Sequence, residues 1–114
     1  MGATILNLPS TVTTTSGETD QLQTGLLYTL AVDVNVSAAS GTSPTLTLFL
    51  DRLGADGVWY PIWSPTAVTA VGTLSTSIGP GCVTAEVPTN NVRLRWTLGG
   101  TTPSFTFSAS IIGR

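Results

Sequence analysis

The sequence predicts an all-β protein, a single antiparallel β-sandwich of the jelly-roll or immunoglobulin-like kind with seven to nine short strands. Apolar and polar residues alternate with a period of two in one segment after another. Turn-forming residues separate these segments at intervals of about 8–12 residues, which is typical of a sandwich. No convincing helical periodicity occurs, and 114 residues suffice for one domain with one core.

The composition is poor in charge and in metal-binding side chains. Charged residues make up 9% of the chain, against roughly 25% in an average globular protein, and the formal net charge is −2. Four basic residues are too few for a nucleic-acid interface, and no histidine and one cysteine do not make a zinc site. We therefore expect no cofactor, no metal and no nucleic acid. Low charge and sheet edges without lysine favour a protein that works in an assembly.

The N-terminal residues 1–24 differ from the rest, and we expect them to form an extended segment beside a β-sandwich domain at residues 25–114. Residues 3–8 have the pattern of a strand, and residues 10–24 are a Thr/Ser-rich run with few core-quality side chains. Two alternatives remain open: a strand of the domain, or an arm that pairs with a neighbouring subunit.

The first strand predicted for the domain spans residues 26–36, where apolar and polar residues alternate cleanly. A loop follows at residues 38–44 because of its Ser, Gly and Pro content, and then a strand at residues 45–53. Phe49 and Asp51 face outward from this second strand. The side chains expected to face the core from the two strands are Leu26, Tyr28, Leu30, Val32, Val34, Val36, Leu46, Leu48 and Leu50.

A hairpin is predicted next, because Asp56 and Gly57 lie between two β segments. Its return strand spans residues 58–64 and contains Pro61. Since proline has no N–H for the ladder, this strand is expected at a sheet edge or with a bulge.

The second half of the chain continues the alternation. Turns are predicted at residues 79–81 and a hairpin at residues 99–103. Cys82, the single cysteine, follows the first of these turns and is expected to be a half-buried small hydrophobic residue. The strands predicted here cover residues 73–78, 82–87, 92–98 and 104–112, and the core side chains of the last two are Val92, Leu94, Trp96, Leu98, Phe105, Phe107, Ala109 and Ile111.

Trp59 and Trp63 are the most concentrated aromatic feature, and alternation places them on one face with Pro61. They are interpreted as a core or subunit contact rather than as a sugar-stacking platform, because no amide or carboxylate cluster adjoins them. Ile5 and Leu8 of the N-terminal segment are further candidates for a subunit interface.

Arg93 and Arg95 complete the candidate interface, on the outward face of one strand. They suit bidentate binding of an acidic partner. The alternative is a cross-strand ion pair with Asp33 or Glu86.

Catalysis is not expected, because the few carboxylates are scattered rather than convergent. Asp51 and Glu86 are the least implausible pair for a glycosidase. Asp51 with Asp56 and Gly57 lacks the spacing of an EF-hand calcium loop.

Two segments carry a resemblance to a known group of proteins. Residues 51–64 read DRLGADGVWYPIWS, and residues 91–111 read NVRLRWTLGGTTPSFTFSASI. Together they resemble the hairpins of small β-sandwich virion proteins of tailed bacteriophages. The resemblance implies a capsid decoration, head accessory or minor tail protein.

We therefore expect a non-enzymatic structural virion protein, foremost a decoration or cement protein on assembled capsomers. Its expected partners are the major capsid protein and copies of itself, in a homo-oligomer with a trimer favoured. Alternatives are a tail-tube or minor tail protein, or a carbohydrate-binding module for host adsorption. No apolar stretch is long enough for a membrane span, and the N-terminus lacks a secretion signal, so synthesis in the bacterial host cytoplasm and residence in the virion are expected.

Overall fold

The computed structural model describes residues 3–25, 27, 29–86 and 88–114. Within this part of the chain there are strands and no helices, and the strands form one antiparallel sheet of seven members. The predicted all-β class is thus confirmed. The strands are β1 (Ala3–Thr13), β2 (Gly17–Glu18), β3 (Leu22–Gln23), β4 (Leu30–Leu53), β5 (Trp59–Trp63), β6 (Gly72–Ile78) and β7 (Asn91–Gly113).

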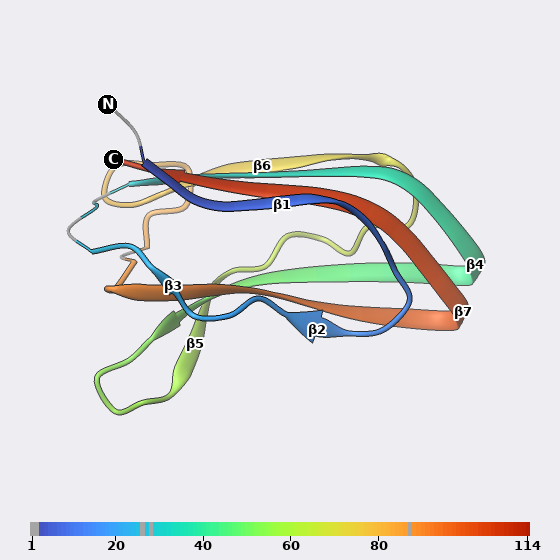
Figure 1. The fold of residues 1–114 in the computed structure, drawn as a ribbon, viewed down its shortest axis with the longest axis horizontal. Coiled ribbons are helices and arrows are strands. Elements are labelled where there is room, and N and C mark those ends of the chain that lie inside the picture. Colours follow the sequence, from blue (N-terminus) through green and yellow to red (C-terminus); the bar gives the residue numbers. More distant parts are fainter. Residues whose placement is uncertain (1–2, 26, 28, 87) are drawn as a thin grey trace.

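Two long strands organise the sheet. β4 has 24 residues and β7 has 23, and they pair antiparallel from Leu30 opposite Gly113 to Arg52 opposite Val92. Both strands bend midway, so the sheet folds back on itself as two facing layers (Figure 1). Because β4 and β7 run through both layers, the layers belong to one continuous sheet.

The upper layer contains β1, β6, residues 30–36 of β4 and residues 104–113 of β7. The lower layer contains β2, β3, β5, residues 45–53 of β4 and residues 91–99 of β7.

The predictions of a loop at residues 38–44 and of a hairpin at residues 99–103 are wrong. These segments are the paired bends of β4 and β7, with register shifts between Val36 and Thr45. Gly41 and Gly100 have φ of 118° and 98°, where side chains rarely fit. A Cβ on Gly100 would lie 2.5 Å from the Ser43 carbonyl oxygen. The glycines that suggested turns therefore allow two strands to bend together, and four predicted short strands become two long ones.

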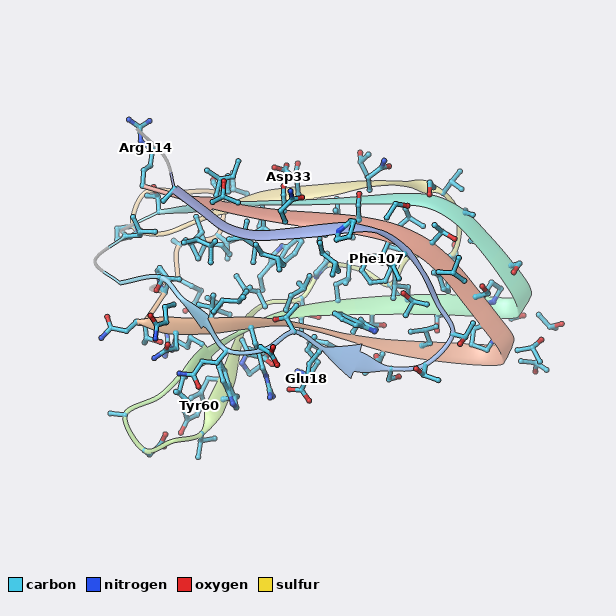
Figure 2. All side chains as sticks on the ribbon, viewed as in Figure 1. Glu18, Asp33, Tyr60, Phe107 and Arg114 are labelled. Atoms are coloured by element: carbon cyan, nitrogen blue, oxygen red, sulfur yellow. The ribbon has the colours of Figure 1, made fainter. Side chains whose placement is uncertain are left out.

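The core lies between the layers, and the inward alternation predicted for β4 and β7 is confirmed. Figure 2 shows Phe107 pointing between the layers. Leu26 and Tyr28, also predicted to face the core, lie outside the described residues. Among the described residues, the buried apolar side chains are Leu30, Val32, Val34, Val36, Leu46, Leu48, Leu50, Ile62, Ile78, Val92, Leu94, Phe105, Phe107, Ala109 and Ile111.

The N-terminal segment pairs with its own chain. β1 runs along β7 from Ala3 opposite Gly113 to Thr13 opposite Phe105. β2 and β3 continue along β7 in the lower layer. In this chain the segment thus forms strands of the same sheet as the rest of the molecule.

The predicted hairpin is present between β4 and β5. Its turn is closed by hydrogen bonds from the Gly54 N–H to the Val58 carbonyl (2.8 Å) and from the Gly57 N–H to the Gly54 carbonyl (3.0 Å). β5 is an end strand of the sheet path and carries a register shift next to Pro61. Both features expected from this proline therefore occur.

The strand predicted at residues 82–87 is not formed by its described residues. Thr84 makes an isolated bridge with Ile78, and Val87 lies outside the described residues. The preceding turn is present, closed by the Cys82 N–H on the Gly79 carbonyl at 3.0 Å. Cys82 is partly buried, as expected.

Candidate functional site

A cluster of arginine and aromatic side chains covers the outer face of the lower layer. Phe49 and Asp51 point outward because they alternate with the buried leucines of β4. The register places Phe49 opposite Arg95 and Asp51 opposite Arg93 on β7. This group is called the arginine–aromatic cluster; its members are Glu18, Phe49, Asp51, Trp59, Arg93 and Arg95.

Asp51 is the centre of the cluster, and its side chain is only 1% exposed. Its Oδ2 accepts hydrogen bonds from Arg93 Nε at 3.0 Å and from Arg95 Nε at 2.9 Å. Its Oδ1 accepts a third from Arg95 Nη2 at 3.3 Å. The hydrogen bond to Asp51 raises the pKa of Arg95 above its ordinary value, against the opposing effect of burial. Both carboxylate oxygens are thus occupied, and the buried charge is compensated.

The two guanidinium groups also lie over aromatic rings. The Arg93 Cζ is 4.6 Å from the Trp59 ring centroid, and the Arg95 Cζ is 3.9 Å from that of Phe49. Such cation–π contacts add to the ion pairs. Arg93 further donates to Glu18 of β2 through Nη1. Each arginine is therefore held on two or more sides.

The ion-pair partners predicted from the sequence for these arginines were wrong. Arg93 and Arg95 bind Asp51 rather than Asp33 or Glu86. Glu86 instead pairs with Arg52 at 3.7 Å. Asp33 lies on the outer side of the upper layer (Figure 2). The outward position of Asp51 was visible in the alternation, but the strand lying next to it was not.

The two tryptophans do not form a joint platform. Trp63 packs against the core cluster that contains Ile62, whereas Trp59 carries Arg93 over its ring. Consecutive residues Leu50 and Asp51 of β4 are opposite Trp63 and Pro61 of β5, so β5 carries one extra residue at this point. This register shift breaks the alternation and turns Trp63 to a different face from Trp59. Of the candidate interface residues, Trp59, Arg93 and Arg95 therefore belong to the arginine–aromatic cluster, and Trp63 does not.

Ile5 and Leu8, the other two candidates, pack against core clusters of their own chain. Both are partly buried on β1. Their apolar surface is thus used largely within the molecule.

The β4–β5 turn carries a second polar contact. Asp56 Oδ1 accepts from the Val58 N–H at 3.0 Å, and Asp56 Oδ2 accepts from the Tyr60 hydroxyl at 2.5 Å. The Tyr60 hydrogen bond, and after it the Val58 N–H, lower the pKa of Asp56 below its ordinary value. The same hydrogen bond, with the negative charge of Asp56, raises the pKa of Tyr60.

The carboxylates weighed above for a metal or catalytic role make other contacts in the structure. No group of three or more His, Cys, Asp or Glu that could hold a metal occurs in the described part of the chain. Asp51 is engaged by two arginines and Glu86 by Arg52. A carboxylate held in this way is poorly placed to accept a proton or attack a substrate.

A polar depression of about 380 Å³ lies on the outer face of the upper layer. The sequence gives no signal for it, because its residues come from four strands that only the fold brings side by side. The polar side chains that line it are Asn7, Asp33, Asn35, Thr73, Ser75, Ser108 and Ser110.

No protein-family model matches this chain, and no curated protein matches it either. Among the described residues, no helix is long and apolar enough to cross a membrane.

Proposed function

We propose that this protein is a non-enzymatic structural component of a tailed-phage particle, foremost a decoration protein that docks on the assembled capsid. The observation that carries the proposal is the arginine–aromatic cluster on the outside of the lower layer. Tryptophan, phenylalanine and arginine are enriched at protein interfaces, and tryptophan and arginine dominate the binding energy there.

The cluster is organised before any partner arrives. Asp51 fixes both guanidinium groups by hydrogen bonds of 2.9–3.3 Å, and the rings beneath them limit their movement. Side chains that are already ordered lose less conformational entropy on binding. A partner would therefore meet a stiff surface rather than four mobile side chains.

The β4–β5 hairpin, which carries Trp59 of the cluster, also exposes apolar surface. Val58 is 50% exposed and Tyr60 is 41% exposed, next to Trp59 in the chain. Their burial by a capsomer would supply the apolar contribution that ion pairs do not give. Binding the assembled shell and not its free subunits would stabilise the shell by mass action.

The test adds purified chain to phage particles assembled without it and measures co-sedimentation. Trp59→Ala is expected to weaken attachment at least tenfold, because it removes the ring beneath Arg93. Ile112→Ala is the matched control: Ile112 is an apolar side chain, 44% exposed, on the opposite layer. Attachment of this control is expected to equal that of the parent chain.

Three results would contradict the proposal. The chain could be absent from purified particles, or attach equally well with Trp59→Ala, or lose attachment only with Ile112→Ala. Electron microscopy with a labelled chain separates head from tail, and label on the tail would favour the tail-protein alternative. Circular dichroism of both variants verifies that each is folded.

A further inference from the structure

We propose that the depression on the upper layer binds a neutral carbohydrate chain through hydrogen bonds. This site is on the opposite face from the arginine–aromatic cluster, and the inference does not depend on the proposed function.

The depression is built from two neighbouring rows of short polar side chains. In the first row, Ser110 of β7 is opposite Asn7 of β1 and Asp33 of β4, and Asp33 is opposite Ser75 of β6. In the second row, Asn35 of β4 is opposite Ser108 of β7 on one side and Thr73 of β6 on the other. Neighbours within a row lie about 4.8 Å apart, and the two rows lie about 6.6 Å apart, two residues along each strand, so together they form one field of polar groups.

These polar groups are available to a ligand. No hydrogen bond joins any of the seven side chains to another described residue. On the lower layer, by contrast, Asp51, Arg93 and Arg95 satisfy one another. The two outer faces thus differ: one is internally paired, and the other presents donors and acceptors outward.

The chemistry of the lining selects the class of ligand. Serine and threonine hydroxyls and asparagine amides both donate and accept, which matches sugar hydroxyls, since these also do both. Among the described residues, Asp33 is the only charged one lining the depression, so an anionic ligand meets repulsion there without a compensating cation. A site built from polar groups leaves them unpaired when a ligand lacks hydroxyls or amides, so an apolar ligand is rejected. The volume of about 380 Å³ lies within the range of small-ligand sites.

The first experiment screens the intact chain on an array of neutral oligosaccharides, built from hexoses and N-acetylhexosamines, and of acidic ones containing uronic or sialic acids. Neutral oligosaccharides are expected to bind, and acidic counterparts of the same length are expected to bind more weakly. Asp33→Asn removes the negative charge of the depression. This variant is expected to narrow the difference in binding between neutral and acidic oligosaccharides.

Calorimetry with the best neutral oligosaccharide then locates the site. Asn35→Ala and Ser110→Ala are each expected to weaken binding about tenfold, the loss of one well-formed hydrogen bond with its partner left unsatisfied. Trp59→Ala is the control on the other face, and its affinity is expected to stay unchanged.

Failure to bind any oligosaccharide on the array would overturn the inference. So would binding that Trp59→Ala abolishes and Asn35→Ala does not, because the tryptophan face would then hold the sugar. Equal retention of unrelated neutral peptides would show general stickiness and would also overturn it. Co-sedimentation of Asn35→Ala with phage particles keeps the two proposals apart, since particle attachment is expected to survive this change.

Discussion

Asp51 is an outward-facing residue of β4 whose carboxylate is nonetheless buried. Two guanidinium groups and the surrounding rings cover it, so its side chain is 1% exposed. Burial strengthens the attraction within such a group, but it also makes the loss of one member costly. Asp51 therefore stabilises the lower layer mainly by compensating Arg93 and Arg95.

Asp51→Asn is expected to lower the free energy of unfolding by about 2–3 kcal/mol, because two arginines lose their shared counter-charge. This loss of stability is smaller than the loss expected for a fully buried ion pair. The side chains of Arg93 and Arg95 are 21% and 29% exposed, so solvent partly screens their charges. Urea denaturation measures it. The control Asp33→Asn, on an exposed residue, is expected to change stability by less than about 0.5 kcal/mol. Equal losses in the two variants would contradict this account.

The pair formed by Asp56 and Tyr60 gives the hairpin a pH dependence. The pKa of Asp56 is lowered in the folded protein. Its contribution to the free energy of unfolding is therefore fully present above the ordinary pKa of 3.8, and it is lost as the pH falls through the lower pKa of the folded state. The pKa of Tyr60 is raised in the folded protein. Its contribution to the free energy of unfolding is therefore fully present below the ordinary pKa of 10.0, and it is lost as the pH rises through the higher pKa of the folded state. The contact is therefore intact between these limits.

Absorbance titration of the phenol tests this pair. In a Tyr28→Phe background only Tyr60 titrates. Asp56→Asn is expected to lower the pKa of Tyr60 toward 10.0, while its amide oxygen still accepts from the Val58 N–H. Asp33→Asn serves as the control and is expected to leave the titration unchanged. A midpoint that does not move in Asp56→Asn would contradict the assignment.

At the scale of elements, the paired bends of β4 and β7 decide the architecture. Each bend contains a glycine with positive φ, and each glycine lies against the backbone of the other strand. In the sequence, such glycines among Ser, Thr and Pro have the composition of a turn. Composition does not distinguish the two structures, because a tight turn and a strand bend both require positive φ and small side chains.

Gly100→Ala is expected to destabilise the protein by at least about 2 kcal/mol, because alanine is strained at this φ and its Cβ meets the Ser43 carbonyl. Gly72→Ala is the matched control in β6, where nothing lies within 4 Å of the added Cβ. It is expected to be neutral or slightly stabilising. Thermal unfolding of both variants measures the difference, and tolerance of Gly100→Ala would show that the bend does not need glycine.

At the scale of the whole molecule, one core joins the two layers. Phe107 of the upper part of β7 meets Trp96 of its lower part edge-to-face, with ring centroids 5.5 Å apart. Since β4 and β7 belong to both layers, neither layer has an independent sheet. We infer that the layers unfold together.

Phe107→Ala is expected to lower the free energy of unfolding by about 3–5 kcal/mol, as for other buried aromatic truncations. Phe107→Leu, which keeps most of the volume, is expected to lose less. In both variants, tryptophan fluorescence, which reports on the lower layer, and far-ultraviolet circular dichroism, which reports on both layers, are expected to give one coincident transition. Separate transitions would show that the layers are independent units.

The sequence by itself determined which described side chains of β4 and β7 face the core and where the β4–β5 hairpin turns. Inward alternation is a local property of an extended backbone, and the Asp56–Gly57 turn is equally local. Only the tertiary structure decided that Asp51 lies between Arg93 and Arg95, which are 42 and 44 residues away. It likewise decided that two glycine-rich segments bend together. The physical reason is that these features depend on which strands become neighbours, and pairing between distant segments is set by packing of the entire core.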